Sequence, residues 1–528
     1  MGYQLLMPQR SIVSAVFFHP DESHWMSSSD FYFQKFFVEQ DWDYNTWRDD
    51  RFGQWSTSNP VIGKYLIGAS LHLFGPRSHN GQRAYYTKRR PEYNYTESFE
   101  WNVDQGSIPP LEEIVAARWV IVWMTIFSSV LLFLLARDLT GHWSVGVVAA
   151  LLFMLDPLVM YSGLRAMIDM PALFFSLAAF CFALRMYNRI YEGARRSAFF
   201  WSLALGVACA LAIGSKLNAL LVGVVCAAWG VLNLFWLYSE SYTSSAPPSQ
   251  SDKTDLRGLS DQLREYKSPF WTTLTSGVVV IVLVFVLFVA LNPFLYVDTL
   301  QNMKHMYEFG QRVAEYEVPD AFQLDSWQKS WENLLVTGLV ETGVFYRYLS
   351  EESWVCPPEQ PFCLPKAQTW GRPYSMELIS RHPWIDAMLV TLGVVWNLLL
   401  VLQPKLSFLG WLGTNNIQRR NHSFLLVWFA ITLVGILYWT PFSWIRWYLP
   451  LEPCWAIFEA SGIVLLLLTT QKVLSGFVPR AIALKNGPSI PIAVNRQNVA
   501  PSQETAPTPS PSSNSMEGEK KSKKSTKG

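Results

Sequence analysis

Nine long apolar runs restrict this chain to a membrane protein built from helices. A bilayer core of about 30 Å takes about 20 helical residues to cross, and most of the runs are close to that length. Because hydrocarbon offers no hydrogen-bond partners to the backbone, such runs fold as helices. We therefore expect an all-α polytopic membrane protein with spans near residues 114–136, 143–163, 168–188, 197–213, 218–238, 271–292, 384–403, 423–441 and 447–470.

Composition agrees with a membrane environment. Only 16% of the residues are charged, against about 25% in soluble domains. Three of the six cysteines, Cys181, Cys209 and Cys226, lie in apolar runs, where a free cysteine behaves as a small buried hydrophobe. Cys356 and Cys363 share a polar loop. They could form a disulfide in an oxidising compartment, or both could be free thiols.

Basic residues predict the orientation of the spans. Alternate threading puts Arg195 and Lys405 on the basic side, which the positive-inside rule makes cytoplasmic, and Asp21 and Cys356 outside. The expected location is the plasma membrane, or the endoplasmic reticulum membrane in a eukaryote. An external N-terminal region needs a preceding span or signal, and the apolar stretch at 11–18 is too short for one. Either the first helix is brief or the true start lies upstream of Met1.

The chain divides into five expected parts. Residues 1–113 should form an N-terminal region with an external catalytic loop, and residues 19–113 of it should form short helices lying on the membrane. Membrane parts at 114–238 and 271–470 should flank a disordered cytoplasmic loop at 239–270, and the second part carries an external loop at 293–383. Residues 471–528 should form a basic disordered tail. One of the short helices should be an amphipathic helix from about Val61 to Phe74, in which Val61, Tyr65, Leu66, Ala69 and Leu73 follow helical spacing.

Ionisable residues gather on the external side of the predicted bundle. They are the adjacent acids Asp21 and Glu22, the acid Asp169, and the cations Arg165, Lys216 and Arg446. Such groups near a membrane are costly and mark function or pairing, although snorkelling side chains are the alternative for each one. Cations of this kind hold phosphates, and a carboxylate takes a proton from an attacking hydroxyl.

No histidine spacing typical of a metal site is found. A divalent cation held by Asp21, Glu22 or Asp169 stays open as a cofactor.

Three segments give the chain a family resemblance. They are His-Pro-Asp-Glu-Ser-His-Trp at 19–25, Ser-Asn-Pro-Val-Ile-Gly-Lys-Tyr-Leu at 58–66 with Leu-Phe-Gly at 73–75, and Ala117-Arg118 followed by Leu164-Arg165 and Asp169-Met170-Pro171. In this order they resemble the GT-C superfamily, specifically the protein O-mannosyltransferase and lipid A aminoarabinose transferase group. Lys216 and the Arg-Trp-Tyr-Leu-Pro stretch from Arg446 are similar to further residues of that group.

The resemblance implies a role for each matched residue. Asp21 matches the catalytic general base, Glu22 supports its loop, and Asp169 matches a second acid that faces the site. The donor phosphate would be held by Arg165, Lys216 and Arg446, and the acceptor or sugar would be contacted by Asn59, Lys64 and Trp55.

The implied function is an inverting glycosyltransferase of the cell envelope. The donor would be a polyprenyl-phosphate sugar, the acceptor a lipid, glycan or protein hydroxyl, and the surrounding partners membrane lipids rather than nucleic acid. Asn59 and Val61 depart from the His and Pro of protein mannosyltransferases, which favours a bacterial enzyme with an unspecified acceptor. A transporter or flippase for lipid-linked sugars, and an oligosaccharide transferase with a diphosphate carrier, remain as alternatives.

Overall fold

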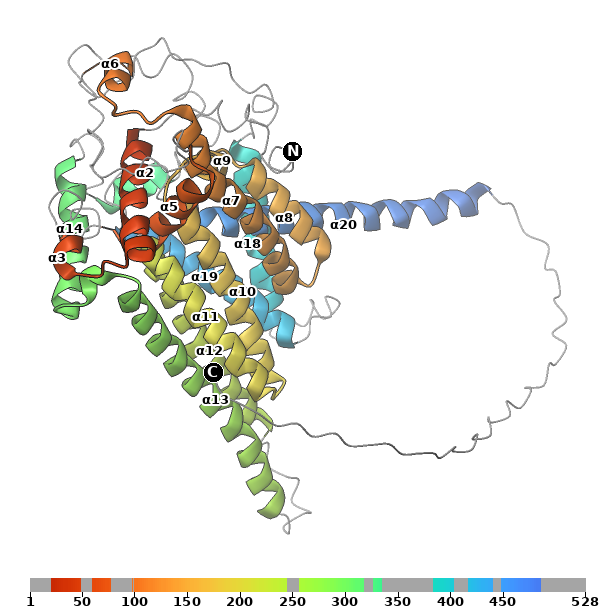
Figure 1. Ribbon diagram of the computed structural model, residues 1–528. Helices are drawn as coiled ribbons and strands as arrows, with labels where there is room; N and C mark the ends of the chain where they lie inside the picture. Colours follow the sequence, from red (N-terminus) through yellow and green to blue (C-terminus); the bar gives the residue numbers. More distant parts are fainter. Residues whose placement is uncertain are drawn as a thin grey trace, which may run out of the picture. The chain divides into compact units, whose positions relative to one another are not determined.

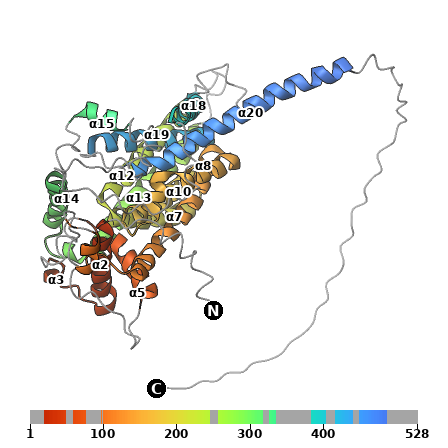
Figure 2. The ribbon, with the colours of Figure 1, turned by 90° about the horizontal axis from the view of Figure 1, so that it is seen from above.

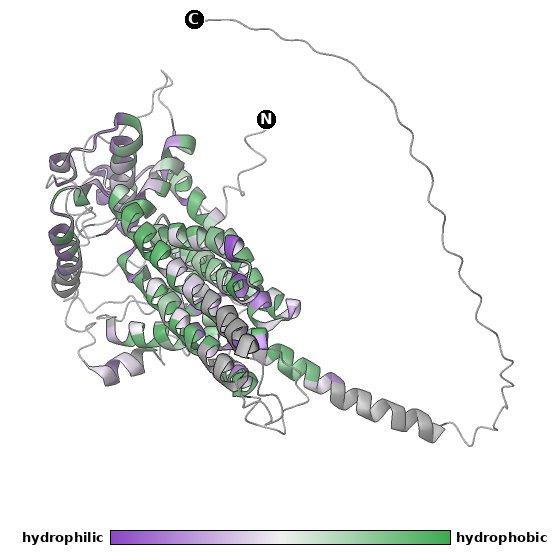
Figure 3. Ribbon diagram, turned by 90° about the horizontal axis from the view of Figure 1, so that it is seen from below, coloured by the Kyte–Doolittle hydropathy of each residue, from purple (hydrophilic) through white to green (hydrophobic). Residues whose placement is uncertain are grey.

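The fold, seen in a computed structural model, is helical throughout the part of the chain that the structure describes. This part comprises residues 20–48, 59–76, 97, 99–244, 256–317, 326–334, 383–402, 416–439 and 448–485. Every regular element in it is a helix, which confirms the predicted all-α class. Eight of its helices are long and apolar enough to cross a membrane, and hydrophobic residues dominate them in Figure 3. The protein is therefore a multi-pass membrane protein.

The long helices pack side by side into a bundle (Figure 1). Helix α10 packs closely against α11 and α7, and α11 packs in turn against α13. These helices belong to one compact unit, Met1–Thr469; Thr470–Gly528 forms a second unit, which contains the last part of the helix Glu452–Lys485. The bundle helices are α7 (Leu111–Thr140), α8 (Trp143–Leu155), α9 (Pro157–Gly163), α10 (Asp169–Tyr191), α11 (Arg195–Ser215), α12 (Leu220–Ser244), α13 (Leu256–Ala290), α18 (Pro383–Leu402), α19 (Asn416–Trp439) and α20 (Glu452–Lys485).

The second predicted span is not one continuous helix. Residues 143–163 form α8 and α9, which meet at Asp156 and Pro157. Proline has no N–H for the helix ladder and starts helices well. The Asp156 carboxylate accepts hydrogen bonds from the Leu158 and Val159 N–H groups, at 2.8 and 2.9 Å, and so begins a new helix. The sequence analysis identified the apolar run correctly, but it missed Asp156 and Pro157, which end one helix and begin the next.

Contacts between distant segments define two ends of the bundle. At one end, Lys216 after α11 pairs with Asp169 at the start of α10. At the other end, the Asn421 side chain of α19 donates to the Asp138 carbonyl of α7, at 2.8 Å. The chain therefore returns to the first end through α8 and α9, as alternate threading requires. We call the end with Asp169 the site end; which side of a membrane it faces stays a prediction.

Short helices gather at the site end. Figures 1 and 2 place α2, α3, α5 and α14 together beside the bundle, and α2 packs closely on α5. Short helices in this N-terminal region were predicted, and their presence is confirmed. The short elements, with α14, are α2 (Pro20–Phe33), the π-helix η1 (Gln34–Glu39), α3 (Tyr44–Arg48), α5 (Ile62–Phe74), α6 (Phe99–Asp104), η2 (Leu217–Ala219), η3 (Pro293–Leu295), α14 (Thr299–Glu317), α15 (Trp327–Asn333) and η10 (Leu449–Leu451).

Helix α5 forms where it was predicted, and the residues that it buries include small and polar ones. Leu73 is 58% exposed, whereas Gly63, Lys64 and Gly68 are buried. A Cβ atom on Gly68 would overlap the Ser29 carbonyl and the Phe33 side chain of α2. The helix therefore uses small residues for a close approach to α2, a mode of packing that does not depend on large apolar side chains. Of the residues at the predicted helical spacing, Val61 and Tyr65 are buried, Leu66 and Ala69 are half-buried and Leu73 is exposed, and contact of this face with a membrane stays a prediction.

Two predicted disordered segments begin as helix. Helix α12 continues to Ser244 and α13 already begins at Leu256, inside the predicted loop 239–270. Residues 256–267 are rich in Leu, Arg, Gln and Glu, which are good helix formers. Helix α20 likewise runs to Lys485, inside the predicted tail 471–528. The three cysteines of the apolar runs are buried as predicted, whereas Cys356 and Cys363 lie outside the described residues.

Candidate active site

The adjacent acids Asp21 and Glu22 lie in the first turn of α2. The sequence suggested a loop here, and the structure instead gives a helix start, where the positive end of the helix dipole favours carboxylates. The two side chains have different surroundings, because Asp21 is half-buried and Glu22 is fully buried. The neighbouring Ser23 hydroxyl donates to the Ser107 carbonyl at 2.5 Å and holds this turn against the segment before α7.

Glu22 forms a buried ion pair with Arg118 of α7. The Arg118 Nε and Nη2 groups donate to Oε1 and Oε2 of Glu22 at 2.7 and 2.6 Å. This two-pronged arrangement is the strongest geometry for a guanidinium and a carboxylate. The Ala166 N–H also donates to Oε1, at 2.8 Å. Glu22 therefore joins α2, α7 and the segment between α9 and α10.

A second ion pair links Asp169 and Lys216. The Lys216 Nζ lies 2.5 Å from Oδ1 of Asp169. Asp169 begins α10, and Lys216 has an extended backbone directly after α11. The tight packing of α10 against α11 places these two helix ends side by side. The side chains keep 7% and 12% of their surface exposed, respectively.

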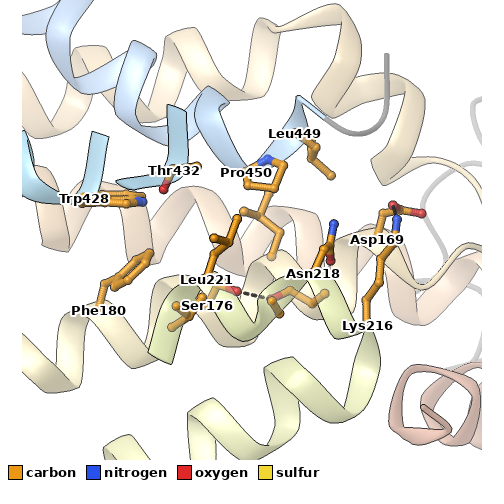
Figure 4. Close-up of a pocket in the computed structure, with 14 residues that line it drawn as sticks. Asp169, Ser176, Phe180, Lys216, Asn218, Leu221, Trp428, Thr432, Leu449 and Pro450 are labelled. Carbon is orange, nitrogen blue, oxygen red and sulfur yellow. Dashed lines mark hydrogen bonds and ion pairs between the residues drawn. The ribbon is translucent and has the colours of Figure 1, made fainter. Parts of the chain in front are cut away.

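This second pair forms one end of a pocket (Figure 4). The pocket lies between α10, η2, α12, α19 and η10, with about 520 Å³ of space that includes its opening. Asp169 and Lys216 point toward one another at one end in Figure 4, and Phe180 and Trp428 lie at the other. The remaining lining side chains are mostly apolar: Ala172, Leu173, Ala219, Leu221, Val222, Leu449 and Pro450, with Ser176, Asn218 and Thr432. A charged end and an apolar body together suit an amphiphile.

Two further predicted residues are buried near these elements. Arg165 is 5% exposed and directly precedes Ala166, whose N–H contacts Glu22. Lys64 is fully buried, and its Nζ lies 5.5 and 5.0 Å from the ring centroids of Trp25 and Tyr32. Burial lowers the pKa of Lys64 well below its usual range. An acceptor or sugar contact by Lys64 would need this aromatic enclosure to open, and it stays a prediction.

The remaining predicted residues are only partly placed. Asn59 is half-buried just before α5, next to the Val61 N–H that donates to Oδ1 of Asn292 at 3.3 Å. Trp55 and Arg446 lie outside the described residues. The structure thus brings Glu22 together with the segment that leads to Asp169, and it joins Asp169 with Lys216.

The acidic residues do not form a preformed cation site. Glu22 directs both oxygens to Arg118, and Asp169 is paired with Lys216. Among the described residues, no group of three His, Cys, Asp or Glu side chains lies close enough to hold a metal ion. Two of the three acids named as possible ligands, Glu22 and Asp169, are thus already paired with basic side chains, and a divalent cation stays a prediction.

Sequence reasoning missed the partner of Glu22. Arg118 was noticed within a motif but received no role, because a separation of 96 positions in the chain hides the contact. A usable signal was present, since an arginine inside an apolar helix is expected to have a partner. The pocket wall from α19 was also missed, because Trp428 and Thr432 resemble ordinary residues of apolar helices.

Comparison with known proteins supports the resemblance over the first half of the chain. Residues 50–295 match the family model of the dolichyl-phosphate-mannose-protein mannosyltransferases, which confirms the predicted similarity to this GT-C group. This matched region contains Arg118, Asp169 and Lys216, but not Asp21 and Glu22. No curated protein matches the chain.

Three solved structures share a distant likeness. The oligosaccharyltransferase of Archaeoglobus fulgidus in the apo form is 12% identical, with a TM-score of 0.39, over 88% of this chain and 52% of that chain. Its complex with an inhibitory peptide and a dolichol-phosphate is 11% identical with the same TM-score, over 89% and 52%. ArnT from Cupriavidus metallidurans, apo, is 15% identical with a TM-score of 0.34, over 88% and 75%. This chain spans about half the length of the archaeal structures, and these scores carry no argument about function.

Proposed function

We propose that this protein is an inverting glycosyltransferase that moves a sugar from a polyprenyl-phosphate carrier to a hydroxyl acceptor at the outer face of a membrane. The observation that carries the proposal is the pocket with a lysine at one end and an apolar body. An amphiphile with one anionic end and a hydrocarbon chain has matching chemistry. The family match over residues 50–295 supports a sugar as the transferred group.

Asp21 is proposed as the general base. It lies half-buried in the first turn of α2, next to Glu22. The acceptor oxygen attacks the anomeric carbon, the proton passes to Asp21, and the bond to the phosphate oxygen breaks with its electron pair on the phosphate. An ordinary carboxylate, with a pKa of about 4, is a weak base for an alcohol. The proton must therefore leave the acceptor hydroxyl while its oxygen forms the bond to the anomeric carbon.

Glu22 is proposed as a positioning residue for Asp21. Its buried pair with Arg118 and its bond from the Ala166 N–H fix the first turn of α2 against two other segments. A base held within a few tenths of an ångström of its productive position acts faster than a mobile one. Asp169 is proposed to face the reacting groups from the neighbouring segment.

The cations are proposed to stabilise the departing phosphate. Lys216 lines the pocket, and Arg165 and Arg446 are predicted to assist it. An electrostatic contact aimed at a charge that develops in the transition state is often worth about 3–4 kcal/mol. The sugar and the acceptor are left unspecified by this chemistry.

Labelled donor separates this proposal from its rivals. Purified protein in nanodiscs would receive a polyprenyl-phosphate sugar labelled in the sugar, with a lipid, glycan or peptide acceptor. Transfer of label to the acceptor, with release of polyprenyl phosphate, is the expected result. Exchange of the intact labelled donor between leaflets without bond cleavage would indicate a flippase and contradict the proposal. Transfer only from a diphosphate-linked oligosaccharide would indicate the other enzyme class.

A further inference from the structure

We propose that Asp169 and Lys216 form an exchangeable ion pair, in which the phosphate of an incoming lipid takes Lys216 from Asp169. Donor binding would then separate the Asp169 carboxylate from Lys216. This inference rests on the proposed function in one respect, the lipid-linked phosphate as ligand. It adds an order of events: the donor binds first, and its binding completes the site.

The position of the pair makes Asp169 and an incoming phosphate competitors for Lys216. Both side chains line the pocket, at the end opposite Phe180 and Trp428 (Figure 4). An anionic group at this end of the pocket meets Lys216 already neutralised by Asp169, at 2.5 Å. The phosphate and Asp169 therefore compete for the same ammonium group.

The Lys216 side chain can change its partner while the helices stay in place. Lys216 has an extended backbone directly after α11, and a lysine presents a point charge on a flexible stem with three donors. Such a group can turn from one anion to another without any change in the helices. A guanidinium in a two-pronged contact, as in Arg118 with Glu22, lacks this freedom because both prongs must break together.

The exchange predicts that removing a residue of the pocket increases the affinity for the ligand. When a ligand must first break an internal contact, its apparent affinity falls by the fraction of protein in the binding-competent state. Removing the competitor Asp169 should therefore tighten the binding of an anionic lipid. Direct repulsion between Asp169 and the phosphate would also tighten binding when Asp169 is removed, but that gain would persist without Lys216, whereas the exchange requires Lys216.

The test measures the affinity of a sugar-free probe. Polyprenyl monophosphate and the uncharged polyprenol of equal length would be titrated into the full-length protein in phosphatidylcholine nanodiscs. We expect Asp169→Asn to bind the phosphate about five- to tenfold more tightly than the wild type. Lys216→Met should bind it more weakly, and Asp169→Asn combined with Lys216→Met should show no tightening relative to Lys216→Met alone.

A matched control corrects for general electrostatics. Glu192→Gln also removes one carboxylate from an ion pair, with Arg189, but both side chains are exposed at the opposite end of the bundle. It should change the affinity less than about twofold, because salt screens exposed charges beyond a Debye length of about 10 Å. If Asp169→Asn does not purify as a monodisperse protein, Asp169→Ser replaces it.

Each result bears on one claim. Tighter binding by Asp169→Asn that requires Lys216 supports the exchange. Unchanged or weaker binding by Asp169→Asn, in a protein that prefers the phosphate to polyprenol, overturns the exchange and leaves the proposed function standing. A wild-type protein that binds polyprenol as well as its phosphate overturns the proposed donor, and the exchange with it.

Discussion

The junction of α2 with α7 and the charged end of the pocket each contain one carboxylate and one cation, but solvent reaches only the second. Glu22 and Arg118 keep 0% and 1% of their side-chain surface exposed, against 7% and 12% for Asp169 and Lys216. A fully buried pair cannot lose one partner without leaving a charge in a nonpolar environment. The first pair is therefore suited to holding helices together, and the second to exchanging partners with a ligand.

The difference also separates the roles of neighbouring residues. Asp21 and Glu22 are adjacent in the chain and chemically alike, yet only Glu22 is fully enclosed. We propose that the buried acid positions the turn and that the half-buried acid acts as the general base. Perturbing the buried pair should therefore mainly change stability, whereas perturbing Asp21 should mainly change turnover.

The largest expected effect on stability comes from Arg118→Met. This change leaves the Glu22 carboxylate buried without its cation, which costs about 3–5 kcal/mol in comparable cases. Thermal unfolding of the purified protein should show a clear loss of stability. The combination of Glu22→Gln with Arg118→Met should recover part of it, because the uncompensated charge is gone. A single variant as stable as the wild type would remove the distinction between the two pairs.

A smaller effect is expected from Gly68→Ala. The added Cβ would overlap the Ser29 carbonyl and the Phe33 side chain, so α5 and α2 must separate, at a cost of about 1–3 kcal/mol for overpacking. Gly223→Ala in α12 is the matched control, since nothing lies within 4 Å of its Cβ position. There alanine should be neutral or stabilising by up to about 1 kcal/mol. Equal thermal stabilities for the two variants would contradict the close packing of α2 on α5.

The smallest effect is expected from Arg189→Met. Arg189 and Glu192 form an ion pair at 2.5 Å, but they are 49% and 45% exposed. Exposed pairs contribute about 0–1 kcal/mol because water and salt screen them. The unfolding temperature should therefore stay close to that of the wild type, and well above that of Arg118→Met. A loss as large as that of Arg118→Met would show that burial does not rank these pairs.

The sequence predicted the fold well where the physical signal was local. Long apolar runs identified the bundle, because crossing a bilayer demands both length and hydrophobicity. Local reasoning failed where two signals competed, as at Asp156 and Pro157, which break an apolar run into α8 and α9. It also missed the close approach of α5 to α2 at Gly68, because a glycine adds nothing to an apolar pattern.

The sequence identified several residues of the candidate site but not which of them contact one another. Spacing and resemblance selected Glu22, Asp169 and Lys216, but neither could pair them. The partner of Glu22 is Arg118, 96 residues away, and the partner of Asp169 is Lys216, 47 residues away. Such pairs arise when antiparallel helices return to the same end of a bundle, which depends on tertiary packing rather than on sequence periodicity.

The most direct test of the account compares sugar transfer by the wild type and by Asp21→Asn in the same nanodiscs, with labelled donor at saturation. Asparagine keeps the shape of the side chain and removes the proton acceptor, so turnover should fall by about 10²–10⁴-fold. Thermal stability and the affinity for polyprenyl phosphate should stay near their wild-type values. An Asp21→Asn protein that transfers sugar at nearly the wild-type rate would contradict the assignment of Asp21 as the general base.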